Sequence, residues 1–220
     1  MPGRFGKQIK KGKAMSDTMN TPLDIVNRAL QILGAKRVAN LDSPTTAAEE
    51  MNSVYALKRD SLIRTRNWSC CIKSGTAILV NETPDNGYLY KYKLPNDCLK
   101  LLSVGNRYTG YSGVEGQFSS NPEWKLSRDC LYTNRAAPLA IEYCFRNQDV
   151  PTYDPLFCEV LAFELAIATA NKIKETQTDI AMLEHLRDNV LSDALICNAI
   201  ERPNEPVPDG NWIAAREEWA

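Results

Sequence analysis

Histidine is almost absent from this chain of 220 residues, because His185 is the only one. The seven cysteines form no Cys-x-x-Cys pair. Zinc sites are built from closely spaced cysteine and histidine ligands, so no zinc site is expected. A nucleophile that needs a histidine base would have to use His185, and no motif surrounds that residue. These shortages argue against metal-dependent and histidine-dependent catalysis.

Motifs of well-known enzyme classes are also missing. The sequence contains no H-E-x-x-H, no Walker A loop and no Gly-x-Gly-x-x-Gly fingerprint. Acids that are adjacent in sequence, such as Glu49 with Glu50, point in different directions on a helix and do not converge on a substrate. Only a pair of catalytic acids assembled from distant parts of the chain stays open. The sequence therefore favours a non-catalytic protein without cofactor or metal.

Long apolar runs are lacking as well, and no secretory segment precedes the cysteines. An odd number of cysteines in such a chain favours reduced thiols and a cytoplasmic setting. Cys70 and Cys71 are neighbours, and in a strand they point to opposite faces. We therefore expect no membrane contact and no disulfide framework.

Net charge is close to zero, at −1, but it is unevenly distributed. Residues 1–15 hold five basic residues and no acid, so the remainder of the chain carries −6. An acidic body argues against binding nucleic acid through broad neutralisation of phosphates. Residues 1–20 show no periodicity and are expected to be a disordered basic tail, with Met15 and Met19 as alternative start sites.

The stretch from Asp154 to Lys174 is expected to be a central helix. Asp154 can cap it and Pro155 suits its first turn. No glycine or proline follows inside the stretch, and its apolar residues lie on more than one side of a helical wheel. A helix that is apolar nearly all round is buried on most sides. Other helices are therefore expected to pack around this one.

The first helix is predicted from clear punctuation near the start of the chain. Thr21 is a suitable cap, Pro22 fits the first turn, and Asp24 completes a capping pattern. Apolar residues then recur at i, i+3, i+4 and i+7. Gly34 is expected to end this helix.

A second helix is expected to open at Ser43 and Pro44, with Thr46 and Glu49 as an alternative capping box. It is expected to give way to a strand at Asn67–Trp68. Basic residues toward its end complement the helix dipole, although they also fit a nucleic-acid patch. These residues are Lys58, Arg59, Arg64 and Arg66.

From Ser69 to Asn147 the apolar period changes toward two, which predicts a sheet. Turn signals separate six candidate strands, at 71–80, 88–94, 99–104, 124–126, 130–133 and 139–145. Tyr88, Tyr90 and Tyr92 alternate with other residues, so their rings are expected on one packed face. The glycine-rich segment 105–116 has no helix after it to complete a phosphate loop. We expect a mobile hairpin tip there.

A fourth helix is predicted after Thr178, which can cap it. Its packing seam is expected at three- and four-residue steps, with His185 outside it on the surface. The seam residues are Ile180, Leu183, Leu186, Val190, Ala194 and Cys197.

Three prolines end regular structure after this helix, at positions 203, 206 and 208. The segment 209–220 then carries apolar residues that either fold back on the same chain or dock on a neighbour. Because Trp and Arg are favoured anchors of docking sites, this segment supplies the candidate interface residues. They are Trp212, Ile213, Arg216 and Trp219.

Several short motifs follow one another in an order that is more informative than any one of them. They are DIVNRAL at 24–30 with Leu33-Gly34, RDSLIR at 59–64 with Asn67-Trp68, YKLPNDCL at 92–99, IEY at 141–143, YDPLF at 153–157 with LAFELA at 161–166, and Trp212-Ile213 with Ala215-Arg216. Together, over residues 21–216, they resemble the tail tubular protein A family, the head-to-tail adaptors of short-tailed bacteriophages. The basic segment 1–15 departs from that family.

The resemblance implies a structural role in the virion, with assembly in the host cytoplasm. Family members form a homo-oligomeric ring, typically dodecameric, beneath the portal protein. The ring joins the portal to the nozzle, a protein of the tail tubular protein B type. Packaged DNA passes through the central channel without sequence-specific binding. No catalysis is needed.

The residue patterns and the resemblance agree on an α+β fold. It is a four-helix bundle with an antiparallel sheet or barrel-like domain inserted between the second and third helices. The expected organisation is a basic tail (1–20), the first part of the bundle (21–68), the β domain (69–150), the second part of the bundle (151–202) and an extended C-terminal arm (203–220).

Two other functional classes stay open at this point. One is a DNA-binding or packaging accessory protein that uses residues 1–15 with Arg59, Arg64 and Arg66. Such a protein would bind DNA with a steep salt dependence. The other is a tail-associated cell-wall hydrolase, which requires acids that converge in a cleft.

Overall fold

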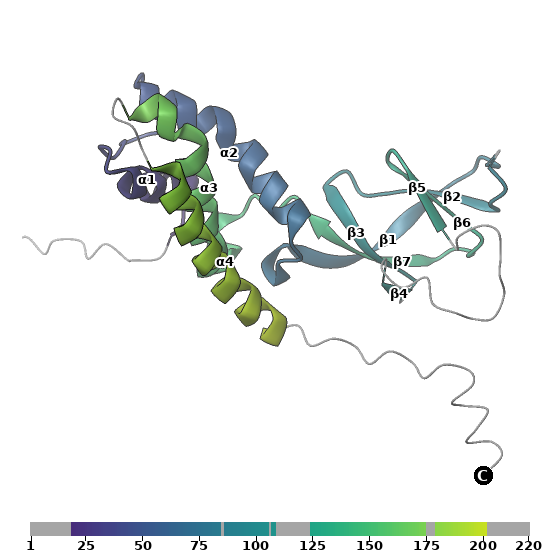
Figure 1. Cartoon of the computed structure of the whole chain (residues 1–220). Coiled ribbons are helices and arrows are strands. Elements are labelled where there is room, and N and C mark those ends of the chain that lie inside the picture. The colour runs from purple at the N-terminus through teal and green to yellow at the C-terminus, as the bar shows by residue number, and fades with distance from the viewer. Residues whose placement is uncertain (1–18, 85, 106, 109–123, 175–178, 202–220) are drawn as a thin grey trace, which may run out of the picture.

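Four helices and an antiparallel sheet make up the part of the chain that the structure, a computed structural model, describes: residues 19–84, 86–105, 107–108, 124–174 and 179–201 (Figure 1). The helices are α1 (Pro22–Leu33), α2 (Thr46–Thr65), α3 (Pro155–Ile173) and α4 (Ile180–Glu201). The strands are β1 (Ile72–Val80), β2 (Tyr90–Lys93), β3 (Cys98–Val104), β4 (Arg107–Tyr108), β5 (Trp124–Ser127), β6 (Cys130–Thr133) and β7 (Leu139–Phe145). The expected mixed fold of helices and antiparallel strands is confirmed. Among the described helices, none is both long and apolar enough to cross a membrane.

Helix α3 is the centre of the helical part, as its sequence predicts. The Asp154 carboxylate accepts hydrogen bonds from the N–H groups of Leu156 and Phe157, at 2.7 and 3.2 Å, and Pro155 takes the first position. Ten of its 19 residues are buried. α1, α2 and α4 each pack against α3. A helix surrounded in this way explains why its apolar residues are not confined to one stripe.

Helix α1 forms with the predicted caps. The Thr21 hydroxyl accepts from the Asp24 N–H at 3.2 Å, and the Asp24 carboxylate accepts from the Thr21 N–H at 2.9 Å. Gly34 ends the helix with a φ of 69°, a conformation that glycine adopts without steric cost.

The predicted start of α2 is wrong by one or two residues. Neither Ser43 nor Thr46 is the cap. Thr45 has the extended backbone of a cap residue, and its hydroxyl accepts from the Ala48 N–H at 3.3 Å. Four hydroxyl or proline residues in succession, 43–46, offer overlapping start signals, so pattern alone does not choose among them.

The seven strands form one antiparallel sheet in the order β4-β3-β7-β1-β2-β6-β5. The first part of β1 pairs with β7, from Ile72 with Cys144 to Ala77 with Leu139. Its last part pairs with β2, from Ile78 with Lys93 to Val80 with Lys91. Because β1 changes neighbour along its length, the sheet curls.

The concave face of the sheet holds a second apolar cluster, separate from the core around α3. Tyr92 and Leu131 at its centre are fully buried. Tyr90 packs against the same cluster, with its ring centroid 6.4 Å from that of Tyr92. The predicted packed aromatic face is therefore confirmed for these two tyrosines. Tyr88 is buried as well, but it precedes β2.

All six predicted strands match the observed ones within two residues at each end. β4 was not predicted. It lies inside the segment expected to be a hairpin tip, and Gly105, with a φ of 56°, leads into it. A strand of two residues is too short to show a period in sequence. Gly110, Gly113 and Gly116 lie outside the described residues.

The expectation that Cys70 and Cys71 point to opposite faces of a strand is wrong. Both lie in a short 3₁₀ turn, Ser69–Cys71, that precedes β1. A 3₁₀ turn does not alternate its side chains as a strand does. The two Sγ atoms are 3.7 Å apart, and the hydrogen bond between them lowers the pKa of Cys70 and raises that of Cys71.

Helix α4 begins one residue after Asp179, whose carboxylate accepts from the Met182 N–H at 3.0 Å. The predicted cap, Thr178, lies outside the described residues. Of the six predicted seam residues, Leu183 and Ala194 are buried and Ile180 and Val190 are partly buried. Leu186 and Cys197 are exposed, so the prediction is wrong for these two. The face toward α3 is turned away from both, because Arg187 rather than Leu186 reaches α3. His185 is exposed, as predicted.

Candidate functional site

The last turn of α4 is fixed to the connection between α2 and β1. The Asn198 Oδ1 accepts from the Ser69 N–H at 2.7 Å, and the Asn198 Nδ2 donates to the Asn67 carbonyl at 2.8 Å. The Ser69 hydroxyl donates to the Glu201 carboxylate at 2.9 Å. The chain therefore continues into residues 202–220 from a point held beside the sheet.

The predicted interface residues Trp212, Ile213, Arg216 and Trp219 all belong to that following segment and lie outside the described residues, as does the basic segment 1–15. The described part of the candidate site is thus the surface from which the arm departs, together with the contacts that position α4.

Ion pairs from α3 fix the helices that surround it. Glu164 pairs with Lys58 of α2 at 3.1 Å and with Arg187 of α4 at 3.0 Å. One partly buried carboxylate thus joins three helices. At the other side of α3, Glu159 accepts from Arg28 of α1 at 2.5 Å, and this hydrogen bond raises the pKa of the guanidinium further.

The return of the chain from the sheet to α3 is built on Asn147, a polar residue that is only 3% exposed. Its Nδ2 donates to the Cys70 carbonyl and to the Thr152 hydroxyl, both at 2.9 Å. Its Oδ1 accepts from the Asp149 N–H at 3.0 Å, and its carbonyl accepts from the Tyr153 hydroxyl at 2.7 Å. The side chain therefore satisfies backbone groups on both sides of the helix–sheet junction.

The arginines of α2 that fit a nucleic-acid patch in sequence are mostly engaged inside the protein. Arg59 is buried and donates to Asp60 at 2.7 Å, and the same carboxylate also pairs with Arg146 at 2.7 Å. Arg64 donates to the Leu99 carbonyl. Arg66, at the end of α2, is exposed. Because Arg59 is buried and Arg64 is bonded to a backbone carbonyl, the three arginines do not form a phosphate-binding surface together.

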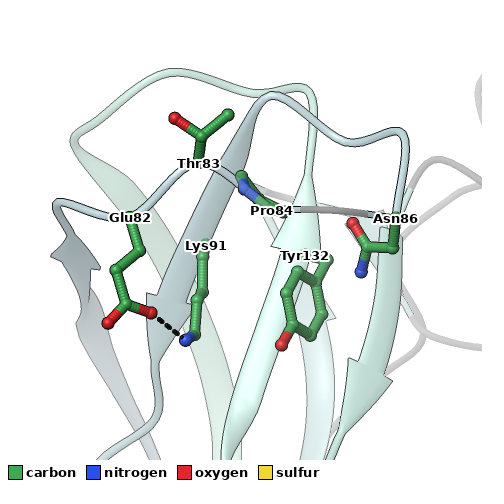
Figure 2. A pocket seen from close by; sticks show the side chains of 6 residues that line it. All are labelled: Glu82, Thr83, Pro84, Asn86, Lys91 and Tyr132. Atoms are coloured by element: carbon green, nitrogen blue, oxygen red, sulfur yellow. Dashed lines mark hydrogen bonds and ion pairs between the residues drawn. The ribbon is translucent and has the colours of Figure 1, made fainter.

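A shallow hollow of about 300 Å³ lies at the tip of the sheet (Figure 2). Its lining contains one carboxylate, Glu82, which pairs with Lys91 at 2.5 Å. Tyr132 lies beside this pair, and Thr83, Pro84 and Asn86 complete the wall. Catalytic acids must face one another across a substrate, and a single paired carboxylate does not meet that need. Within the described ranges, no three His, Cys, Asp or Glu side chains are placed to hold a metal ion.

Nine large apolar side chains of the described residues are exposed, and four of them lie on α4. Leu57 of α2 is 71% exposed. On α4 the exposed fractions are 52% for Met182, 37% for Leu186, 59% for Ile196 and 75% for Ile200. Leu79 and Leu126, at the two ends of a row that crosses the concave face of the sheet, are partly uncovered as well. Exposed apolar surface of this kind marks contact sites for other molecules.

Tyr55 illustrates a buried polar group without a partner. Its hydroxyl makes no hydrogen bond among the described residues, and burial raises its pKa to about 12. Tyr153 is also buried, but its hydroxyl donates to the Asn147 carbonyl. The two tyrosines therefore form a matched pair, one with a hydrogen-bond partner and one without.

We expect Tyr55→Phe to leave the free energy of unfolding at pH 7 unchanged or up to about 1 kcal/mol higher, because it removes a buried group that has no partner. Tyr153→Phe should lower it by about 1 kcal/mol. Since the folded pKa of Tyr55 lies above the ordinary value of 10, the wild-type protein keeps its full free energy of unfolding below pH 10 and loses part of it as pH rises from 10 toward 12. Urea denaturation at pH 7 and pH 11 measures both effects. An equal loss for the two variants at pH 7 would contradict the assignment.

Most of these contacts have no signal in the sequence. Asn147, Asn198 and Glu164 are ordinary polar residues whose partners lie far away along the chain. The exposed apolar residues of α4 do leave a signal, because their spacing can be read from the sequence. The predicted packing seam of α4 included only Leu186 of these exposed residues.

A scan against protein-family models finds no match for this chain, and a search of curated proteins finds none either.

Proposed function

We propose that this chain is a structural head-to-tail adaptor of a short-tailed bacteriophage, similar to the tail tubular protein A family that its motifs resemble. In this proposal, copies of the chain form a ring, dodecameric as in that family, between the portal protein and a nozzle of the tail tubular protein B type. DNA passes through the ring without sequence-specific binding. The protein acts in the virion neck and is not an enzyme.

The observation that carries the proposal is the way the sheet is attached. The chain enters the sheet at Ile72 and leaves it just after Cys144, and these two residues are paired between the neighbouring strands β1 and β7. A module with adjacent entry and exit points can project from a helical body without disturbing it. The proposal is that residues 21–68 and 151–202 form one four-helix bundle and that residues 69–150 form an inserted β domain.

An adaptor must resist being pulled apart between two partners. Here the ion pairs of Glu164 join three helices, and Asp60 of α2 pairs with Arg146, which follows β7. Asn147 and Asn198 add hydrogen bonds at the same junction. Such links favour a rigid connection between the helices and the sheet, which suits a part that transmits force and has no need to open around a substrate.

The anchoring of α4 gives the C-terminal arm a defined starting point beside the junction. The proposal assigns residues 203–220 to docking on the portal or on an adjacent subunit, with Trp212, Ile213, Arg216 and Trp219 as the anchors. An arm that follows a fixed helix end loses less freedom on docking than one that follows a loose end.

The test uses purified full-length chain and portal rings of the phage that encodes it, mixed and separated on a density gradient. The full-length chain should co-sediment with the portal rings. A chain cut after Arg202 should remain at the top of the gradient, and Trp212→Ala with Trp219→Ala should behave like the cut chain. Leu57→Glu, at an exposed position on α2, serves as the control that still binds.

Two outcomes would contradict parts of this proposal. Unchanged binding by the cut chain would rule out the arm as the docking element. Failure of the full-length chain to bind portal rings, together with DNA binding that weakens steeply between low and moderate salt, would favour the DNA-binding class instead.

A further inference from the structure

Helix α4 carries a second apolar stripe that does not face α3. Its apolar members are Met182, Leu186, Ile196 and Ile200, all exposed. Between the two apolar pairs, the same stripe holds exposed Asn189 and Asp193. α4 lies at the outside of the helical part (Figure 1).

The six residues form a regular series. Their steps along the chain are four, three, four, three and four residues. At 3.6 residues per turn, they all lie within about 80° of one another around the helix axis. This is the a/d spacing of a two-stranded coiled coil, with polar residues in its central layer. The stripe spans about 27 Å at 1.5 Å per residue, which is most of the helix.

The series is also symmetric about its middle, Leu191. Met182 and Ile200 are equally far from this residue, as are Leu186 and Ile196, and as are Asn189 and Asp193. If two copies of α4 lie antiparallel, each apolar residue meets an apolar residue of the second copy. The Asn189 amide of each copy then lies against the Asp193 carboxylate of the other copy and can donate to it. The dimer therefore contains two such contacts.

The charge of Asp193 favours the antiparallel over the parallel arrangement of the two helices. A parallel pair in register would place Asp193 against Asp193 of the second copy, two like charges in the centre of the contact. The antiparallel pair separates the two carboxylates and gives each one an amide donor. The positions that flank the stripe contain no Asp, Glu, Lys or Arg that would oppose the approach. They are Leu183, His185, Val190, Ser192, Cys197 and Ala199.

We propose that a second copy of this chain covers the stripe, and that the free protein is a two-fold dimer held by an antiparallel pair of α4 helices. Because the same patch is used on both copies, this contact closes on itself and builds no larger ring. The dimer is therefore a form of the unassembled chain. It stands or falls independently of the proposed adaptor function.

Sedimentation equilibrium of the full chain, from about 1 to about 300 µM, tests the dimer. The expected result is a reversible monomer–dimer equilibrium in the micromolar range. Ile196→Glu places a charge in each apolar half of the contact and should raise Kd by about tenfold or more. Ile196 is exposed in the single chain, so the variant should fold normally, which circular dichroism checks. Leu57→Glu, the same kind of change on α2, should leave Kd unaltered.

Asn189→Lys tests the direction of the pair. In the antiparallel dimer the new cation faces Asp193 of the second copy, so Kd should fall. In a parallel dimer it faces another lysine, so Kd should rise. The proposal is overturned by a wild-type chain that stays monomeric across the range, by association that survives Ile196→Glu, or by a rise in Kd with Asn189→Lys.

Discussion

Replacement of Phe157 by alanine is expected to lower the free energy of unfolding by about 4 kcal/mol. Phe157 is fully buried at the start of α3. Its ring centroid lies 5.1 Å from that of Trp68 and 4.9 Å from that of Tyr153, with interplanar angles of 77° and 76°. Alanine removes the apolar transfer energy and both edge-to-face contacts, and it leaves a cavity between rings that cannot close on it.

Phe157 lies where several elements of the fold meet, so its replacement destabilises more than α3. Trp68 follows α2, and its indole N–H donates to the Leu62 carbonyl at 3.2 Å. Tyr153 belongs to the segment that returns from the sheet. The ring of Phe157 therefore packs where α2, α3 and the connections to the sheet meet.

Urea denaturation followed by circular dichroism measures the change. Phe157→Leu should lose only about 1–2 kcal/mol, because it keeps most of the buried volume. Leu57→Ala, at a side chain that is 71% exposed, should change the free energy of unfolding by less than about 0.5 kcal/mol. A loss below about 1 kcal/mol for Phe157→Ala would show that the three rings do not pack together.

Asn147→Ala should have the next largest effect, a loss of about 2–3 kcal/mol in the free energy of unfolding. The substitution removes two donors and one acceptor from a side chain that is 3% exposed. The Cys70 carbonyl, on a half-buried residue, loses its donor, and the exposed Thr152 hydroxyl loses a donor that water can replace. A buried polar group left without a hydrogen-bond partner lowers the free energy of unfolding by more than the formed hydrogen bond contributes to it.

The matched control is Asn171→Ala, which changes an exposed asparagine of α3 and should stay within about 0.5 kcal/mol of the parent protein. The same denaturation experiment serves both variants. Equal stability of Asn147→Ala and Asn171→Ala would mean that the junction does not depend on the Asn147 side chain.

The parts of this fold that sequence predicts well are those fixed by neighbouring residues. Thr21 with Asp24, Gly34 and Asp154 are cap signals in which donor and acceptor are at most four residues apart. Turn-forming residues bound the strands in the same local way, so strands such as β6 and β7 begin and end where predicted. Where several local signals overlap, as around Thr45, the prediction shifts by a residue or two.

Contacts between distant segments were not predictable in the same way. The side chain of Asn198 meets Ser69 across 129 residues, and Arg28 meets Glu159 across 131. Nothing in the pattern of one segment specifies its partner at that range. The prediction of which face of α4 packs against α3 was partly wrong for a related reason. The helix has two apolar stripes, and the sequence does not say which one faces α3. Its heptad spacing nonetheless shows that both stripes exist.

Electron microscopy of purified full-length chain mixed with portal rings tests the adaptor proposal most directly. The proposal predicts a ring of copies added to one face of each portal, coaxial with it, with an open central channel. Portal rings that stay bare at saturating concentrations of the chain, or copies found along DNA and not on the portal, would contradict it.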